Sequence, residues 1–264
     1  MSRLEGKVAL VTGAARGTGA EIANLFVEEG ARVVSTDILD DRGSEHAAAI
    51  GARFVHLDVT SETNWSAVID NVRRTEGRLD VLVNNAAVLH LTSIDNTTVE
   101  IFEQVFRVNC LGAFLGVRAA LPLMRESGGG SVVNIGSIDS VLGVPATVAY
   151  TSSKFALRGL TKVAALENGK FGIRCNIVCP AAGSAEMYGS LVGPPLEIPT
   201  EGAQRRGATP RLPLGRSRGP IDVAGAALFF ASDDSRFCTG VELVIDGGMT
   251  AGEYVSVPGQ FDTQ

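Results

Sequence analysis

Seven short stretches of mostly apolar, often β-branched residues recur along the chain, separated by longer segments of mixed polarity. They cover residues 7–12, 31–36, 52–57, 79–84, 130–135, 173–179 and 241–246. Several are almost continuously apolar, as strands are when helices cover both faces of their sheet. Most of the intervening segments are long enough for crossover helices. The pattern predicts an α/β fold, a Rossmann-type doubly wound sheet of seven mainly parallel strands with helices on both faces.

Helical periodicity lies between these stretches. Residues 19–30 place Ile22, Leu25 and Phe26 on one stripe and end at Gly30, a residue typical of helix ends. A further helix is expected to begin near Ser61, which can cap the turn that precedes Trp65. Residues 223–231 are apolar throughout and indicate a core helix. No linker or repeat divides the chain, so we expect a single domain over residues 1–264.

Two segments do not follow this alternation of predicted strands and helices. Residues 181–219 contain five prolines and seven glycines, which excludes one regular element and predicts a loop with short helical pieces. Long loops in compact domains are uncommon unless they bind something, so we expect a substrate loop there. The residues after Asp246 are also irregular, and we expect them to be frayed or docked on a neighbouring subunit.

Composition limits the possible partners. Of the 264 residues 45% are hydrophobic and 20% are charged, with a net charge of −6. The broad cationic surface that binds a phosphate backbone is missing, so nucleic acid is not an expected partner. No uninterrupted apolar run approaches the roughly 20 residues that cross a bilayer, and none resembles a signal-peptide core. We therefore expect a cytoplasmic protein with no membrane partner.

Cysteines and histidines give no support for a metal site. The four cysteines contain no CxxC pair, and the three histidines are scattered along the chain without ligand spacing. We expect no metal, and we interpret the cysteines as reduced packing residues.

The glycine-rich stretch TGAARGTG, residues 12–19, follows the first predicted strand and opens the first helix. Glycines at 13, 17 and 19 let the backbone turn tightly and approach a pyrophosphate, whose charge then lies at the positive end of the helix. A purely structural turn is the alternative. The position at the first strand-to-helix junction favours phosphate binding.

Two charged residues bear on which dinucleotide would bind. Asp37 ends the second strand, where an acid binds the adenosine ribose hydroxyls and repels the extra phosphate of NADP. Arg16, within the glycine loop, could instead pair with that phosphate. Asp37 has the more direct position, so we predict NAD. The alternative for Asp37 is a structural cap of the following turn.

The stretch YTSSK, residues 150–154, places a phenol and an ammonium on one face of a helix. A free phenol has a pKa near 10, too high for an efficient base at neutral pH. A neighbouring ammonium favours the phenolate, so we expect Lys154 to lower the pKa of Tyr150. Tyr150 can then take the proton of an alcohol or return it to a ketone. An incidental pair on a surface helix is the alternative.

The ordered set of motifs resembles the short-chain dehydrogenase/reductase family from Lys7 to about Gly248. The motifs are TGAARGTG, LDVT (57–60), NNAA (84–87), VNCLG (108–112), GS (136–137), YTSSK and VIDGG (244–248). The resemblance implies an NAD-dependent alcohol dehydrogenase acting on the CH–OH group, with a dinucleotide-binding catalytic domain. It is closest in pattern to hydroxysteroid and alicyclic alcohol dehydrogenases. Proteins of this family are commonly homotetramers.

The resemblance also implies a role for individual residues. Tyr150 and Lys154 act as described, Ser137 orients the substrate oxygen with Ser140 as the fallback, and Asn109 holds a water of a proton relay. Lys154 also bonds the nicotinamide ribose. The expected cofactor contacts are Gly13, Arg16, Gly17, Thr18, Gly19, Asp37, Ile38, Asp58, Val59, Asn85, Ala86, Ala87, Val108, Tyr150, Lys154, Pro180, Gly183 and Ser184.

The chain departs from the family pattern after the sixth strand. CPAAGSAEM, residues 179–187, keeps Pro180 but has Ala185 where the family carries a threonine that bonds the nicotinamide carboxamide. Ser184 or a backbone amide would have to substitute for it. A hydrogen bond of this kind is typically worth ~1 kcal/mol, so its loss is tolerable.

The substrate loop favours a bulky apolar or alicyclic, steroid-like secondary alcohol or ketone. Residues 181–199 are mostly apolar, although ordinary loop packing would explain them equally. Five arginines follow, at 205, 206, 211, 216 and 218, as is typical of a solvated face. Alternatively they bind a carboxylate or CoA phosphate, which would indicate a 3-hydroxyacyl substrate. A non-catalytic NAD-binding regulator is less favoured, because all four catalytic residues are present.

Overall fold

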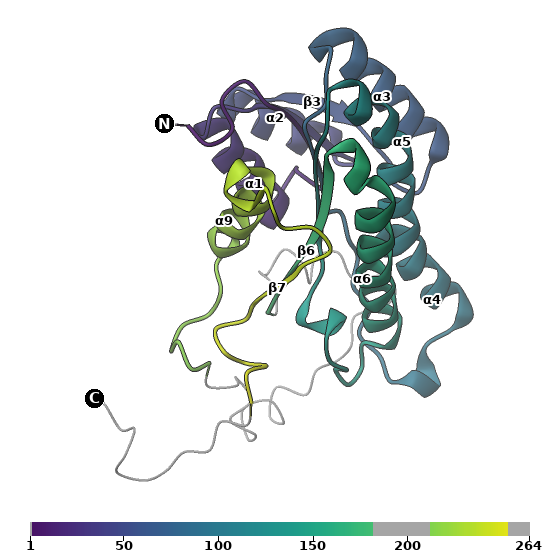
Figure 1. Ribbon diagram of the computed structural model, residues 1–264. Helices are drawn as coiled ribbons and strands as arrows, with labels where there is room; N and C mark the ends of the chain where they lie inside the picture. The colour runs from purple at the N-terminus through teal and green to yellow at the C-terminus, as the bar shows by residue number, and fades with distance from the viewer. Residues whose placement is uncertain (1, 182–211, 253–264) are drawn as a thin grey trace.

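The computed structural model describes residues 2–181 and 212–252 (Figure 1). Its seven strands form one sheet in the order β3-β2-β1-β4-β5-β6-β7, and every neighbouring pair is parallel. The strands are β1 Val8–Thr12, β2 Arg32–Asp37, β3 Arg53–His56, β4 Val81–Asn84, β5 Gly130–Ile135, β6 Ile173–Pro180 and β7 Glu242–Ile245. Each lies within about two residues of its predicted position, so the predicted fold class is confirmed.

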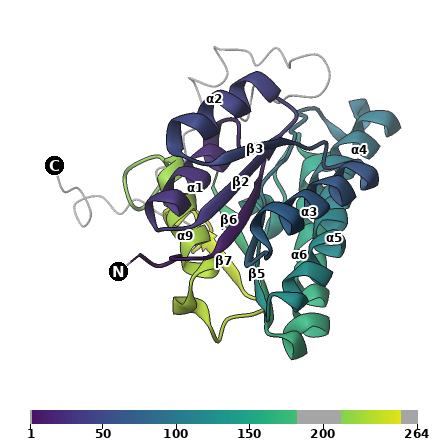
Figure 2. The same cartoon turned by 90° about the horizontal axis from the view of Figure 1, so that it is seen from above.

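Helices cover both faces of this sheet (Figures 1 and 2). One face carries α1 Gly17–Glu28, α2 Asp40–Ile50 and α9 Pro220–Ala231. The other face carries α3 Glu62–Glu76, α4 Val99–Phe106, α5 Gly112–Glu126 and α6 Val148–Asn168. Short elements complete the described chain: the 3₁₀ helices η1 Ile94–Asn96, η3 Ile138–Ser140, η4 Gly169–Phe171 and η5 Asp233–Ser235, and the π-helix η2 Arg107–Leu111.

The apolar stripe of α1 is buried against α9. Ile22 and Phe26 are fully buried together with Val223 and Phe230 of α9, whereas Leu25 is only partly buried. The helix begins two residues earlier than predicted, because the last turn of the glycine loop is already helical. α9 is the core helix that the apolar run predicts.

The predicted start of α3 is also confirmed. The Ser61 hydroxyl accepts a hydrogen bond from the Asn64 amide at 3.2 Å, as an N-cap does. Trp65 and Val72 are among the α3 residues buried on the opposite face of the sheet from α1.

The elements α4, η2 and α5 join into one helical run, Val99–Glu126. By length and composition this run is apolar enough to cross a membrane, and 44% of its most apolar window is buried inside the protein. The sequence prediction counted only uninterrupted apolar stretches. It missed this run because polar residues such as Asn109 lie among the apolar ones.

The carboxyl ends of β1, β2, β4, β5 and β6 meet at one edge of the sheet. The strand order reverses between β1 and β4 at this edge, and ligands of open α/β sheets bind at such a reversal. Of the predicted substrate loop, the structure describes Ala181 and residues 212–219, and the remainder lies outside the described residues.

Candidate active site

The glycine loop adopts a conformation that other residues would not tolerate. Gly13 and Gly17 have φ values of +65° and +57°, in the left-handed region. A Cβ atom on Gly19 would lie 2.1 Å from the carbonyl oxygen of Gly13. The glycines therefore allow the first turn of α1 to pack directly against the end of β1.

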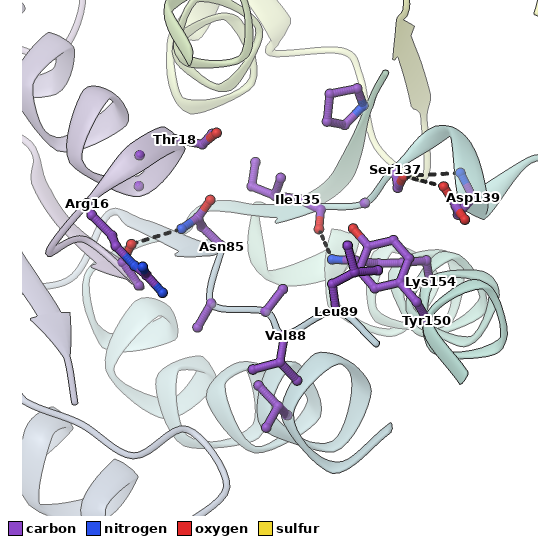
Figure 3. A pocket seen from close by; sticks show the side chains of 18 of the residues that line it. Arg16, Thr18, Asn85, Val88, Leu89, Ile135, Ser137, Asp139, Tyr150 and Lys154 are labelled. Atoms are coloured by element: carbon purple, nitrogen blue, oxygen red, sulfur yellow. Dashed lines mark hydrogen bonds between the residues drawn. The ribbon is translucent and has the colours of Figure 1, made fainter. Parts of the chain in front are cut away.

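Asn85, directly after β4, fixes this loop together with Thr12 at the end of β1. The Asn85 side chain, shown in Figure 3, donates to the carbonyl oxygens of two loop residues, Thr12 at 2.9 Å and Gly13 at 3.1 Å. The Thr12 hydroxyl accepts from the amides of Asn85 and Ala86 at 3.0 and 3.1 Å. The loop is thus held in shape by bonds within the protein before any ligand binds.

The first turn of α1 has the features of an anion site. Arg16 occupies the N-cap position, and its side chain accepts no hydrogen bond from the amides of the first turn. These amides therefore have no side-chain cap as a partner. Such amides, together with the positive end of the helix dipole, favour a phosphate group.

Asp37 has a structural role and also lines the site. Its carboxylate accepts from the amides of Ile38 and Leu39 at 2.8 and 3.1 Å, and from that of Ala15 at 3.0 Å. It therefore caps the turn after β2, as the alternative interpretation has it, and also borders the cavity described next.

One cavity of about 540 Å³ joins these parts, within the roughly 300–1,000 Å³ range of small-molecule sites. The predicted residues that line it are Gly13, Arg16, Gly17, Thr18, Gly19, Asp37, Ile38, Asp58, Val59, Asn85, Ala86, Ala87, Val108, Ser137, Tyr150, Lys154 and Pro180. Asn109 lies outside its lining. Gly183, Ser184 and Ala185 lie outside the described residues.

Tyr150 and Lys154 lie together on α6, facing the cavity (Figure 3). The Lys154 Nζ atom is 5.4 Å from the centre of the Tyr150 ring and donates to the carbonyl oxygen of Ile135 at 2.8 Å. Burial lowers the pKa of Lys154 to about 8. Lys154 therefore loses its proton more readily than a surface lysine does.

The pKa of Tyr150 differs from the sequence prediction. Burial raises this pKa above the ordinary phenol value, and the Asp139 carboxylate raises it further. Hydrogen bonding with Ser137 and the charge of Arg218 act in the opposite direction. The prediction that the site lowers the pKa of Tyr150 is wrong, because it left out desolvation and the Asp139 carboxylate, which both raise this pKa.

The Asp139 carboxylate belongs to a polar cluster beside Ser137 and Tyr150. The Ser137 hydroxyl donates to Asp139 at 2.9 Å, and the hydroxyls of Thr147 and Thr151 donate to its other oxygen at 3.0 and 2.8 Å. The sequence analysis missed Asp139 and Thr147 as lining residues. The available signal was an acid two residues after Ser137, just beyond an apolar strand.

Asn109 is placed by the π-helix η2, beside α6. It accepts from the Val88 amide at 2.8 Å, and it donates to the Val88 carbonyl at 2.9 Å and the Ser153 hydroxyl at 3.1 Å. A small second cavity lies between Asn109 and Lys154, with room for roughly one water molecule. Ser140, the fallback for Ser137, is fully buried and bonds the Ser137 amide at 3.2 Å, outside the main cavity lining.

Two of the five arginines are described, and they differ. Arg216 is exposed and pairs with Asp222 at 2.7 Å, as expected of a solvated face. Arg218 instead lines the cavity, where its Nε donates to the Ala181 carbonyl at 3.1 Å. Arg205, Arg206 and Arg211 lie outside the described residues.

Known proteins resemble this chain over nearly its whole length. A short-chain dehydrogenase family model described as enoyl-(acyl carrier protein) reductase matches residues 13–250. A 3-alpha-(or 20-beta)-hydroxysteroid dehydrogenase of Mycobacterium bovis is 43% identical over 254 residues, covering 95% of this chain and 92% of the relative. Cyclopentanol dehydrogenase of Comamonas sp. is 38% identical over 256 residues, covering 95% and 100%.

Two further matches extend this picture. Trans-4-hydroxycyclohexanecarboxylate dehydrogenase of Sinomonas cyclohexanicum is 38% identical over 261 residues, covering 95% of each chain. A solved structure described as a short-chain alcohol dehydrogenase from Sinorhizobium meliloti 1021 superposes with a TM-score of 0.84 at 32% identity, covering 95% of this chain and 98% of its own. Fold, motifs and relatives agree: the chain is an oxidoreductase acting on CH–OH groups with a nicotinamide cofactor, and it belongs to the short-chain dehydrogenase/reductase family.

Proposed function

We propose that this protein is an NAD(H)-dependent dehydrogenase that interconverts a secondary alcohol and a ketone, with Tyr150 as general acid and base. The observation that carries the proposal is one continuous cavity of about 540 Å³. It runs from the glycine loop and Asp37 to Ser137, Tyr150 and Lys154. A dinucleotide bound along it would bring its nicotinamide toward Tyr150, the one phenol among the described residues of the lining.

The protein's residues fit the pyrophosphate and the adenosine ribose of a dinucleotide. The uncapped first turn of α1 would hold the pyrophosphate, and Asp37 at the end of β2 would accept from the adenosine ribose hydroxyls. The charge of Asp37 opposes an extra phosphate there, which favours NAD over NADP. Bound NAD+ supplies the hydride acceptor for alcohol oxidation.

The residues that transfer the proton lie on α6 and on the elements packed around it. Tyr150 receives the proton of the substrate alcohol, and Ser137 holds the substrate oxygen. Because burial raises the pKa of Tyr150, its phenolate depends on nearby positive charge. The charge of Arg218 lowers this pKa, and the Lys154 Nζ atom lies 5.4 Å from the centre of the phenol ring. Asn109 and the small cavity beside Lys154 offer a route for the proton toward solvent through one water.

The substrate end of the cavity favours a bulky alicyclic or steroid-like alcohol. Its lining includes the apolar residues Val88, Leu89, Leu91, Val144 and Met249. Apolar walls with a few polar groups suit a neutral ring system better than an anion. The names of the hydroxysteroid and cyclopentanol relatives agree with this substrate class.

A second candidate is an alicyclic hydroxy acid or another substrate bearing a carboxylate. Arg218 favours it, because its guanidinium lines the cavity close enough to Tyr150 to influence the pKa of the phenol. A guanidinium binds a carboxylate through two parallel hydrogen bonds. The relative named for trans-4-hydroxycyclohexanecarboxylate supports the same idea.

A substrate panel tests both candidates. Cyclopentanol, a 3α-hydroxysteroid and trans-4-hydroxycyclohexanecarboxylate are each assayed with NAD+ and NADP+, following the absorbance of the reduced nicotinamide. We expect turnover with NAD+ and a preference for the neutral alcohols. A carboxylate preference that Arg218→Ala abolishes, with Arg216→Ala as the matched control, would establish the second candidate. Absence of turnover throughout would contradict both, and a preference for NADP+ would contradict the role given to Asp37.

We further propose a homotetramer. Large apolar side chains are exposed on two helices that lie on the same face of the sheet (Figure 2): Phe114 on α5, and Phe155, Val163 and Leu166 on α6. Leu166 is 85% exposed. Contact with other copies of the chain would remove this surface from water.

A further inference from the structure

We propose that Asp139 is a positioning residue that sets the placement of Ser137 relative to Tyr150. One carboxylate oxygen holds the Ser137 hydroxyl, and the other holds the two threonines that flank Tyr150 along the chain. This inference rests on the proposed function, because Ser137 and Tyr150 are the residues that act on the substrate oxygen there.

The contacts of Asp139 reach two separate segments, and Figure 3 shows those with Ser137. Within the loop after β5, its Oδ2 accepts from the Ser137 hydroxyl at 2.9 Å, and its own amide donates back to the same hydroxyl at 3.1 Å. Toward α6, its Oδ1 accepts from Thr147 at 3.0 Å and from Thr151 at 2.8 Å. Asp139 is only 7% exposed, so water competes little for these bonds.

These bonds determine the orientation of the Ser137 hydroxyl relative to the cavity. A serine hydroxyl has one hydrogen and two lone pairs. Asp139 takes the hydrogen, and its amide occupies one lone pair. The remaining lone pair can accept from the hydroxyl of an alcohol substrate or from Tyr150. To donate to a ketone oxygen, Ser137 must first release Asp139.

The same carboxylate ties down the start of α6. Thr147 is the N-cap residue of that helix, yet its side chain caps no helix amide. Its hydroxyl instead shares its hydrogen between Asp139, at 3.0 Å, and the Val144 carbonyl, at 2.8 Å. It is also 2.7 Å from the hydroxyl of Thr151, one turn later. Tyr150 lies between these two threonines. Asp139 thus connects the loop that carries the substrate-orienting hydroxyl to the turn that carries the phenol.

The negative charge of Asp139 also affects the pKa values of Tyr150 and Lys154. Other groups near Tyr150 and Lys154 are Arg218, before α9, and the thiols Cys110 on η2 and Cys179 on β6. Among them Asp139 is the carboxylate, and it raises the pKa of Tyr150 and of Lys154. Without its charge the phenolate would form at lower pH, so activity that requires the phenolate would also begin at lower pH.

The test is the pH profile of kcat/KM for alcohol oxidation with Asp139→Asn. The acid limb, where Tyr150 loses its proton, is expected to move down by about one pH unit. Turnover on the plateau is expected to fall roughly tenfold, because a neutral amide holds the Ser137 hydroxyl less firmly. Asp70→Asn, an exposed position on α3, is the matched control and should leave both quantities unchanged.

Two further variants separate positioning from a general effect on folding. In a Ser137→Ala background, Asp139→Asn should cost far less turnover than it does alone, since Asp139 acts through Ser137. Thr151→Val keeps the charge of Asp139 but removes one bond to α6. It should lower kcat several-fold without moving the acid limb, and this result remains available should Asp139→Asn fail to fold.

An unmoved acid limb in folded Asp139→Asn, or losses that simply multiply with those of Ser137→Ala, would overturn the inference. So would unchanged turnover in Thr151→Val. Each of these results requires an active wild-type enzyme. A wild type that turns over no alcohol with either nucleotide would instead contradict the proposed function itself.

Discussion

Gly19 lies so close to the carbonyl oxygen of Gly13 that a methyl group has no room. Asn85 and Thr12 hold that part of the loop in place, so the backbone cannot easily move aside. At the scale of single residues, the site therefore depends on glycines, which leave room for close backbone contacts, as much as on reactive side chains.

Gly19→Ala should consequently weaken nucleotide binding by roughly 100-fold and lower the free energy of unfolding by about 1–3 kcal/mol, the usual cost of overpacking. Fluorescence titration with NAD+ and urea unfolding measure the two effects. Gly225→Ala is the matched control, because an added Cβ on this α9 residue meets only open space. It should leave affinity unchanged and raise stability by up to ~1 kcal/mol. Wild-type affinity in Gly19→Ala would argue against the phosphate-binding loop.

Some residues of the site could be predicted from the sequence and others could not. Residues 12–19 and 150–154 are recognisable because their chemistry depends on local spacing, which a sequence displays directly. Asp139 and Arg218 reach the cavity from separate segments, and only the fold brings them near Tyr150. The pKa of Tyr150 was predicted in the wrong direction for the same reason, since burial is a property of the folded chain.

At the scale of elements, α3 shows how a local signal fixes the start of a helix. Ser61 caps the Asn64 amide, and the helix then buries Trp65 beneath the sheet. Ser61→Ala should lower the free energy of unfolding by about 1 kcal/mol, the usual value of an N-cap. Urea unfolding measures this change, with Ser66→Ala on the exposed face of the same helix as the control. Equal stabilities of the two variants would show that the cap contributes nothing.

The strands were predicted more accurately than the helical segment at 99–126. Each strand is marked by an apolar run, because helices cover the sheet on both sides. The helical run mixes polar and apolar positions and passes through a π-helical turn at Asn109, so no simple periodicity describes it. The turn nevertheless places Asn109 against Val88 and Ser153, beside the small cavity next to Lys154.

At the scale of the whole molecule, the exposed apolar surface of α5 and α6 bears on assembly. Light scattering should give a mass about four times the 27.5 kDa of one chain. Leu166→Glu, which adds a charge where the side chain is most exposed, should shift the distribution toward smaller species without unfolding the chain. Glu103→Gln, an exposed position on α4, serves as a control that should keep the wild-type mass. A wild-type mass equal to that of a single chain would refute the tetramer.

The central claim concerns the whole cavity. The glycine loop and Asp37 bind the nucleotide at one end, and Tyr150 transfers a proton at the other end. Tyr150→Phe tests it most directly, because it removes one hydroxyl and keeps the ring that packs in the core. NAD+ affinity should stay close to that of the wild type while kcat for alcohol oxidation falls by about 10²- to 10⁴-fold, the range of general acid and base catalysis. Turnover in Tyr150→Phe equal to that of the wild type would contradict the account.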